Sequence, residues 1–229
     1  MDIPKISKRL EAAASFMRRG GRIADIGTDH AYLPIYLCAT GAAVGGVASD
    51  INEGPTQRAR TNTELFGVRD KIAVVRTDGL NGIEKYAPDD IFILGMGGEL
   101  IVKIIDEAPW VKEGKRLILQ PMTHPEIVRE YLFANGFSVI DETLAEDEKI
   151  YQIICAEYTG VNSEATPLEL LVGRLNTERG GELLTMLLHN TRRVYCARVE
   201  GKAQAGADAS AEQAMINEID DILRGGDTK

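Results

Sequence analysis

The chain has 229 residues, of which 44% are hydrophobic, and it carries a formal net charge of −9. This length suits one α/β domain of ordinary size plus an appendage, and the acidic balance argues against a nonspecific nucleic-acid binder, which needs a basic surface. No apolar run approaches the roughly 20 residues of a membrane span, and the first residues lack a signal-peptide pattern. We therefore expect a cytoplasmic protein without membrane contact. Three widely spaced cysteines with no C-x-x-C pattern argue against disulfides and against a metal site.

The first predicted element is an amphipathic helix that ends near Gly20-Gly21. Ile6, Leu10, Ala13 and Met17 recur at helical spacing, so this helix should cover a sheet and present its basic side outward. Six cations and one acid give residues 5–22 a local charge of +5; the cations are Lys5, Lys8, Arg9, Arg18, Arg19 and Arg22. The cluster is either a solvated helix face or a contact surface for an RNA backbone.

Strands and helices are then predicted to alternate along the chain. The strands are 23–26, 44–49, 72–76, 91–94 and 117–119, and the helices between them are 31–39, 53–66, 99–107 and 125–135. This alternation predicts a parallel sheet with helices on both faces. Two further strands, 137–144 and 150–157, are joined by the polar tip Glu146-Asp147-Glu148 and predict a closing antiparallel pair. Seven strands ending in such a hairpin are typical of the Rossmann-like class I methyltransferase fold.

The pattern changes after Thr159-Gly160, so we expect an α/β domain over residues 1–160 and a helical extension over 161–229. A short helix from Pro167 precedes the breaker Gly180-Gly181. Two apolar stripes follow, one of Leu184, Leu187, Leu188, Thr191, Val194 and Tyr195, and one of Met215, Ile216, Ile219, Ile222 and Leu223. A turn over 201–210, with a capping box from Ser210 to Gln213, predicts an antiparallel, coiled-coil-like hairpin.

The turn after the first strand points to a cofactor. A dinucleotide site needs G-x-G-x-x-G, whereas this turn contains only Gly27, and Asp29 follows two positions later. A pyrophosphate would therefore face carboxylates, which disfavours an NAD-dependent oxidoreductase. S-adenosylmethionine carries a sulfonium and an ammonium, which Asp25 and Asp29 would attract. We predict a pocket for this cofactor beyond the carboxyl ends of the strands.

Two more strand ends carry acids that suit an adenosine. Asp50 ends the second strand, where a carboxylate can accept both ribose hydroxyls, and Ile51 can lie against the adenine face. Asp78 follows the third strand and can accept the exocyclic amine, while Gly79 allows close backbone approach. Asp78 could instead be a helix cap or a turn aspartate. Acids at three successive strand ends favour the cofactor site.

The fourth and fifth strands end in residues that suit a second ligand. The fourth strand ends in Gly95, Met96, Gly97 and Gly98, where three glycines in four positions remove side chains at a point where two ligands approach each other. The Asp/Asn-Pro-Pro-aromatic motif with which amino-group methyltransferases hold an exocyclic amine is absent there. Gln120, at the end of the fifth strand, either reads the edge of a base or is simply a polar strand terminus.

At these residues the chain resembles a known family. The run A-D-I-G-T-D-H-A-Y-L-P over 24–34, the turn 95–98 and Leu119-Gln120-Pro121 are similar to bacterial S-adenosylmethionine-dependent tRNA methyltransferases that act on N1 of adenine 22 in the D-arm. The similarity covers residues 5–160 closely, and the helical tail by architecture only. It implies a catalytic Rossmann-like domain, tRNA as substrate and a tail that helps to bind it. In this tail Arg192, Arg193 and Arg198 are the candidate RNA contacts.

The expected chemistry needs few catalytic groups. Adenine N1 has an in-plane lone pair, so attack on the methyl group mainly requires alignment. Asp29 could stabilise the positive charge that develops on the base, and Tyr32 could stack on a base taken out of its RNA context. His30 either orients Asp29, touches the base or is structural. The alternatives are a methyltransferase for a small molecule or protein and a noncatalytic nucleotide-binding module. We expect a monomer.

Overall fold

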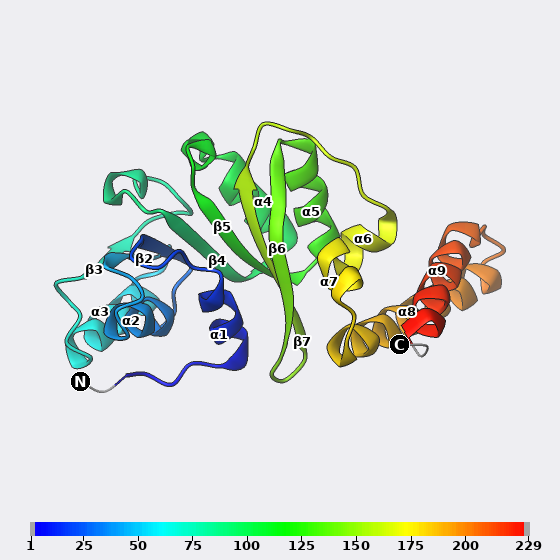
Figure 1. The fold of residues 1–229 in the computed structure, drawn as a ribbon, viewed down its shortest axis with the longest axis horizontal. Coiled ribbons are helices and arrows are strands. Elements are labelled where there is room, and N and C mark those ends of the chain that lie inside the picture. Colours follow the sequence, from blue (N-terminus) through cyan, green and yellow to red (C-terminus); the bar gives the residue numbers. More distant parts are fainter. Residues whose placement is uncertain (1–2, 227–229) are drawn as a thin grey trace. The chain divides into compact units, whose positions relative to one another are not determined.

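The computed structural model describes residues 3–226, which divide into two compact units, one ending at Ser163 and one beginning at Glu164 (Figure 1). Within the first unit, seven strands form one sheet in the order β3-β2-β1-β4-β5-β7-β6. The strands are β1 (Arg22–Ile26), β2 (Gly45–Asp50), β3 (Ile72–Arg76), β4 (Asp90–Gly97), β5 (Arg116–Thr123), β6 (Phe137–Glu146) and β7 (Ile150–Tyr158). The first five run parallel and β7 runs antiparallel to both of its neighbours, which confirms the predicted Rossmann-like methyltransferase fold.

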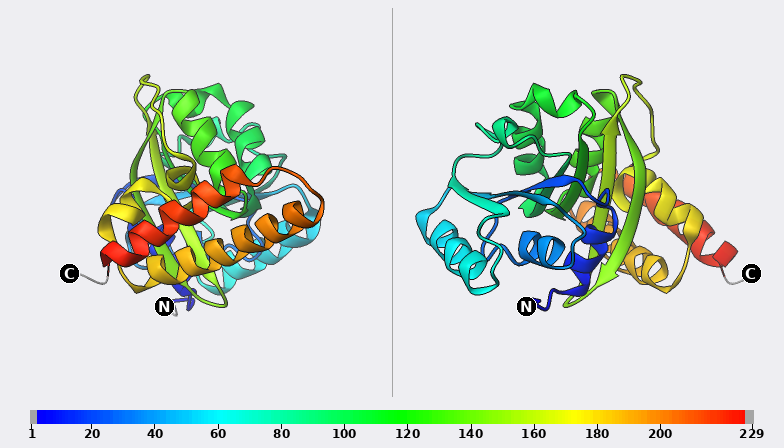
Figure 2. Two further views of the ribbon diagram at one scale, coloured as in Figure 1. Left: turned by 90° about the vertical axis from the view of Figure 1, so that its right-hand side faces the viewer. Right: turned by 60° about the vertical axis from the view of Figure 1, so that its left-hand side comes forward.

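Helices cover both faces of this sheet (Figures 1 and 2). In chain order they are α1 (Lys8–Ser15), α2 (Tyr32–Ala39), α3 (Glu53–Leu65), α4 (Gly98–Asp106) and α5 (Pro125–Ala134), with short 3-10 turns η1 (Glu84–Tyr86) and η2 (Pro109–Lys112). The helices α1, α2 and α3 share one apolar core with the sheet, and α4 and α5 share the other. Strand β1 supplies both cores in alternation, because Ile23 belongs to the first and Ala24 and Ile26 belong to the second.

The first helix is shorter than predicted. It ends at Ser15, so Ile6 and Met17 are buried outside the helix. Its first N–H groups are capped from far away, since the backbone N–H groups of Lys8 and Arg9 donate to the Asp147 carboxylate at the tip between β6 and β7. This contact lowers the pKa of Asp147, chiefly through the Arg9 N–H.

The basic segment around α1 is not a uniformly solvated surface, which corrects that expectation. Arg18 pairs with the buried carboxylate of Asp90 at 2.7 Å, and Arg22 donates to the Tyr86 carbonyl at 2.9 Å. Arg9 turns toward β5 and its guanidinium lies 5.4 Å from the centre of the Tyr151 ring. These three cations therefore connect the basic segment to other parts of the first unit through an ion pair and hydrogen bonds.

The second unit consists of two short helices and a long helical hairpin. They are α6 (Pro167–Val172), α7 (Arg174–Arg179), α8 (Glu182–Gln204) and α9 (Ser210–Gly226), and α8 and α9 lie side by side (Figure 2, left). The predicted single helix after Pro167 is divided at Gly173, and the predicted turn begins later because α8 runs through Gly201. A complete capping box fixes the start of α6, from Thr166 to Glu169.

The hairpin corrects two residue assignments. Ser210 is the first helical residue of α9, and its N–H and hydroxyl both donate to Asp208, so the capping box predicted there is wrong. Val194 is exposed, whereas Leu184 and Leu188 are buried, so the apolar stripe of α8 is narrower than predicted. The remaining turns of α8 contact α9 partly through ion pairs, with Arg192 to Asp220 at 2.6 Å and Lys202 to Glu212 at 2.7 Å.

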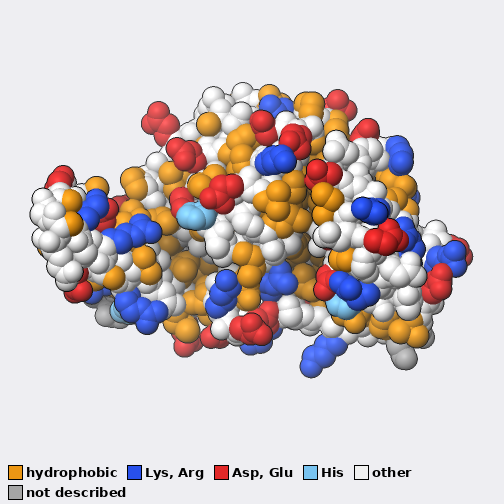
Figure 3. Space-filling model, turned by 180° about the vertical axis from the view of Figure 1, so that it is seen from behind, with side chains coloured by type: hydrophobic (Ala, Val, Ile, Leu, Met, Phe, Trp, Pro, Cys, Tyr) orange, Lys and Arg blue, Asp and Glu red, His pale blue; other side chains and the backbone are white. Residues whose placement is uncertain are grey.

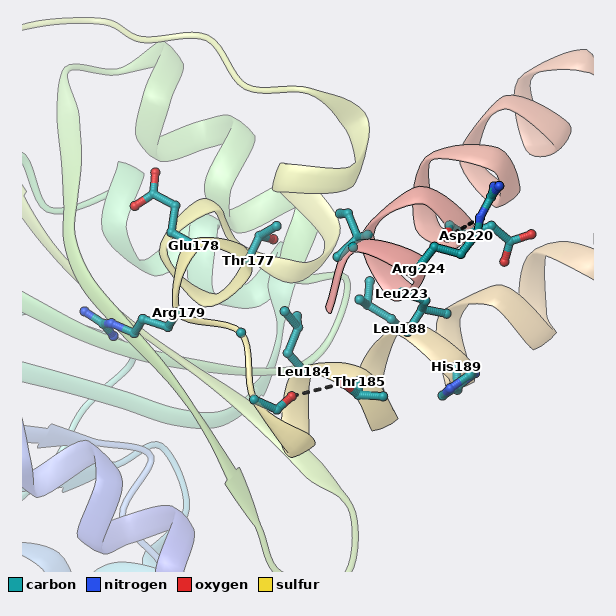
Figure 4. A pocket seen from close by; sticks show the side chains of 14 residues that line it. Thr177, Glu178, Arg179, Leu184, Thr185, Leu188, His189, Asp220, Leu223 and Arg224 are labelled. Carbon is teal, nitrogen blue, oxygen red and sulfur yellow. Dashed lines mark hydrogen bonds between the residues drawn. The ribbon is translucent and has the colours of Figure 1, made fainter. Parts of the chain in front are cut away.

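A cavity of about 920 Å³ lies in the second unit, where α7 meets α8 and the end of α9 (Figure 4). Leu184, Leu188 and Leu223 form its apolar wall, and Arg224 and Asp220 lie at its edge. It contains none of the residues that the sequence assigned to cofactor or substrate. Among residues 3–226, no helix combines the length and the apolar character that crossing a membrane requires.

Candidate active site

The turn after β1 is fixed to the neighbouring strand by its backbone. Gly27 has a positive φ of 76°, and the N–H groups of Gly27 and Thr28 both donate to the Ser49 carbonyl at 2.8 Å. Asp25, the second-last residue of β1, is 8% exposed. Burial raises the pKa of Asp25 to about 6, although a hydrogen bond from Thr28 and the charge of Arg9 act in the opposite direction. A buried carboxylate held in this way suits a cationic ligand.

The segment that follows is a bend and not the start of a helix. Ala31 adopts the left-handed conformation and α2 begins at Tyr32, so Asp29 and His30 precede the helix. The His30 ring stacks on the Tyr32 ring, with centroids 5.2 Å apart and an interplanar angle of 10°. Tyr32 remains 39% exposed. The His30 carbonyl accepts a hydrogen bond of 2.9 Å from Asn62 on α3, which fixes the bend to that helix.

Asp29 has partners that sequence reasoning missed. Its Oδ1 accepts from Nε of Arg58 at 3.1 Å and from Nη2 of the same side chain, and its Oδ2 lies 3.1 Å from Nε2 of His30. His30 therefore does contact Asp29, as one of the sequence alternatives proposed. Arg58 lies 29 positions along the chain on α3, and its spacing from Asp29 carries no sequence signal.

The ends of β2 and β3 lie at the same edge of the sheet as Asp25. Asp50 pairs in register with Arg76, and its Oδ1 accepts the Asn52 N–H at 2.7 Å. Ile51 and Asp78 are exposed beyond these ends. Gly79 has a positive φ of 52°, and a Cβ there would lie 3.3 Å from Ile104. The structure thus brings the predicted adenosine residues to one edge, because parallel strands end together.

Two of the three glycines in the turn 95–98, Gly95 and Gly98, are required for different reasons. Gly95 sits at a bulge in the pairing of β4 with β5, with a φ of 76°, so β4 continues beyond the predicted end at Leu94. Gly98 packs against the backbone of the neighbouring loop, and a Cβ there would overlap the His124 carbonyl oxygen. The Met96 methyl group lies where a Cβ of Gly27 would lie, so the turns after β1 and β4 touch.

Gln120 is fully buried and its amide is used within the protein. Its Oε1 accepts from Arg9 at 2.6 Å and from the Gly95 N–H at 3.2 Å, and its Nε2 donates to the Pro121 carbonyl at 2.9 Å. Arg9 therefore reaches the centre of the strand-end edge, where its Nη1 would lie 3.7 Å from a Cβ at Gly95. Its position in a basic cluster before β1 was the only signal in the sequence.

The candidate RNA contacts of the tail lie on α8. Arg192 is paired with Asp220, Arg193 donates to Asn190 at 3.3 Å, and the Arg198 guanidinium lies 4.8 Å from the centre of the Tyr195 ring. The Arg198 side chain is exposed. Figure 3 shows basic and acidic side chains interspersed on one face of the molecule. Within the described part of the chain, no group of three His, Cys, Asp or Glu side chains could hold a metal ion.

Parallel strands that end in acids, with a glycine turn on the central strand, define a Rossmann-like methyltransferase, and the methyltransferase domain family matches residues 6–154. The chain belongs to the tRNA (adenine(22)-N(1))-methyltransferase family, because it is 37% identical to the Bacillus subtilis enzyme of that name over 96% of this chain and 94% of the relative.

Two solved structures are similar over nearly their whole length. The Bacillus subtilis m1A22 tRNA methyltransferase TrmK is 31% identical with a TM-score of 0.82, and 97% of each chain is covered. A Streptococcus pneumoniae protein described as a candidate tRNA (m1A22) methyltransferase, in complex with S-adenosyl-L-methionine, is 30% identical with a TM-score of 0.86. That alignment covers 96% of this chain and all of the other.

Proposed function

We propose that this protein transfers a methyl group from S-adenosylmethionine to N1 of adenine 22 in the D-arm of tRNA. The observation that carries the proposal is the placement of Asp25, Asp50 and Asp78 at the ends of three parallel strands, with a single glycine in the first turn. The nearly full-length relationship to a tRNA (adenine(22)-N(1))-methyltransferase supports the choice of base and position.

The residues at the strand ends fit this cofactor. Asp50 and Ile51 would hold the ribose and one adenine face, and Asp78 with Gly79 would meet the adenine edge. The buried carboxylate of Asp25 suits the cationic methionine part. Arg9 supplies the cation that a methionine carboxylate needs, because it lies above Gly95 and its charge acts on Asp25. The turn of Gly95, Met96 and Gly97 would leave room for the methyl group and the base.

The chain would contribute alignment and charge stabilisation. When bound, S-adenosylmethionine supplies a methyl group whose C–S electron pair returns to sulfur as adenine N1 forms the new C–N bond. Tyr32 would hold the base plane, since its ring is partly exposed and supported by the His30 ring on one side. Asp29 would stabilise the positive charge that the base acquires. Gln120 would act through Arg9 and Gly95, whose positions it fixes.

The decisive test is methylation of an unmodified tRNA transcript with labelled cofactor, followed by chromatography of the digested nucleosides. We expect 1-methyladenosine from the wild-type transcript and none from a matched transcript with guanine at position 22. N6-methyladenosine or a methylated guanosine as the direct product would refute the assignment. Tyr32→Ala should lower the rate through lost stacking, worth about 1–3 kcal/mol per base, whereas Tyr32→Phe should be mild.

We also propose that the protein works as a cytoplasmic monomer without a metal. The chemistry supports the last point, because a sulfonium already activates the methyl group and N1 needs no Lewis acid. The second unit would serve RNA binding through Arg192, Arg193 and Arg198, and the first unit would carry the cofactor and the reaction. Light scattering during size-exclusion chromatography tests the oligomeric state, and unchanged activity in a chelator tests the metal.

A further inference from the structure

Both oxygens of the carboxylate proposed to act on the base have a protein partner. One oxygen of Asp29 accepts two N–H groups of Arg58, and the other faces Nε2 of His30 at 3.1 Å. A carboxylate whose charge is compensated by a guanidinium stabilises a second cation poorly. Asp29 can therefore act on a methylated adenine only when Arg58 has been drawn away.

This ion pair is suited to exchange. The Arg58 and Asp29 side chains are 48% and 60% exposed, and ion pairs at such exposed sites contribute only about 0–1 kcal/mol. Arg58 lies on α3, which packs beside α2 at the strand-end edge (Figure 1). A backbone phosphodiester offers a guanidinium the same pair of oxygens and the same single negative charge as a carboxylate does, so it competes directly for the same donors.

We propose that Arg58 senses the tRNA backbone: a phosphate near the target base takes the guanidinium from Asp29, and the released carboxylate then faces the base held at Tyr32. This proposal rests on the proposed function. Arg58 is a positioning residue: its guanidinium compensates the negative charge of Asp29 or releases it, and it does not touch the reacting atoms. The exchange makes the charge of Asp29 available only when tRNA is bound. Free adenosine has no backbone phosphate, so with it Arg58 would stay paired with Asp29.

The neighbouring cation Arg60 provides a matched control. It lies on the same helix, its side chain is 40% exposed, and it also pairs with an acid, Glu53, at 3.4 Å. The ion-pair partners of Asp29 are Arg58 and His30, whereas Arg60 pairs with Glu53. Arg60→Gln therefore removes an equivalent charge from the same helix without touching the proposed exchange.

The test is a double-mutant cycle on tRNA affinity, measured with protein saturated in S-adenosylhomocysteine. Arg58→Gln should weaken tRNA binding about tenfold and lower the salt slope of binding by about one, with cofactor affinity unchanged. Asp29→Asn should tighten tRNA binding about threefold, because Arg58 no longer has to leave a partner, and yet slow methyl transfer. In the double variant, Asp29→Asn should give no tightening.

The cycle separates the exchange from simpler explanations. Equal tightening by Asp29→Asn in both backgrounds would mean only that a repulsive charge had been removed, and would overturn the proposal. An effect of Arg58→Gln no larger than that of Arg60→Gln would also overturn it. Failure of the wild-type protein to form 1-methyladenosine would instead refute the proposed function. Formation of that product together with an additive cycle would refute the exchange alone.

Discussion

The guanidinium of Arg9 donates a hydrogen bond of 2.6 Å to Oε1 of Gln120, although the two residues are 111 positions apart. The same oxygen accepts the Gly95 N–H, so one buried amide fixes both the cation and the central glycine turn. The first helix is therefore a wall of the candidate active site. Of the cations in the basic segment, Arg9 is the one that reaches Gln120 and Gly95 at the candidate site.

The first prediction concerns the ligand of Arg9. Arg9→Met should weaken S-adenosylmethionine binding by roughly tenfold or more, because a charge-assisted bond to the methionine carboxylate is lost. Binding of 5′-methylthioadenosine, which lacks that carboxylate, should hardly change. Titration calorimetry with both ligands measures the difference, and Arg19→Met, in the same basic segment, is the control. Equal losses for both ligands would remove Arg9 from the carboxylate site.

The second prediction concerns stability and Asp25. Because burial raises the pKa of Asp25 to about 6, the folded protein holds this proton at pH values where the unfolded chain has lost it. The free energy of unfolding should therefore fall as the pH rises from about 4 to 6, and stay lower above that range. Asp25→Asn should stabilise the cofactor-free protein by up to about 3 kcal/mol at pH 8 and very little at pH 4. Urea denaturation at both pH values tests this, and a gain independent of pH would contradict it.

A third prediction concerns the effect of the same proton on cofactor binding. A cationic ligand favours the Asp25 carboxylate, so S-adenosylmethionine affinity should fall as the pH drops below about 6. Near pH 6 binding should release a proton, which calorimetry in buffers of different ionisation enthalpy would detect. In Asp25→Asn the affinity should be lower and flat over this range. Proton release that persisted in Asp25→Asn would assign it to another group.

The fourth prediction concerns Gly98. A Cβ there would overlap the His124 carbonyl oxygen and lie 3.1 Å from that of Thr123, and backbone atoms cannot move away cheaply. Gly98→Ala should therefore destabilise the protein by about 1–3 kcal/mol and disturb the turn 95–98. Gly201→Ala, in the middle of α8 with no heavy atom within 4 Å of its added Cβ, should instead stabilise the helix by about 1 kcal/mol. Thermal melting of both variants should show shifts of opposite sign.

The fifth prediction concerns the second unit. A chain ending at Ser163 retains the whole sheet and the last backbone hydrogen bond of the first unit, from the Ser163 N–H to the Phe133 carbonyl. It should bind S-adenosylmethionine normally but lose tRNA methylation. In the full chain, replacing Arg193 and Arg198 with Gln should weaken tRNA binding and leave cofactor binding intact. Full activity of the shortened chain would confine RNA recognition to the first unit.

The sheet and its acids could be predicted because both depend on local patterns. Apolar runs and helical spacing indicated the order of elements, and parallel strands place their carboxyl ends at one edge, so Asp25, Asp50 and Asp78 meet without further information. The partners of long side chains could not be predicted in this way. Arg18 finds Asp90 and Arg9 finds Gln120 only after the chain has folded, because no spacing rule connects them.

Helix boundaries failed for a related reason. The spacing of Ile6 and Met17 suggested one long first helix, yet both residues lie outside the helix and are buried there. Ser210 had the sequence context of a cap, but Asp208 lies two positions earlier and takes its N–H. In both cases a competing local or tertiary contact replaced the one that the sequence pattern favoured.

The cap on α1 has a consequence for biosynthesis. The carboxylate that accepts the Lys8 N–H lies 139 residues further along, at the tip of the last strand pair. The local N-cap, Ser7, accepts the Leu10 N–H, but the first helix leaves the ribosome long before the acceptor of its Lys8 and Arg9 N–H groups exists, and contacts this distant in sequence form slowly. We expect the nascent chain to keep this helix undocked until β6 and β7 have emerged. Arg9 would then be among the last residues of the candidate active site to reach its final position. A chain terminated before β6 and β7 could not complete that site.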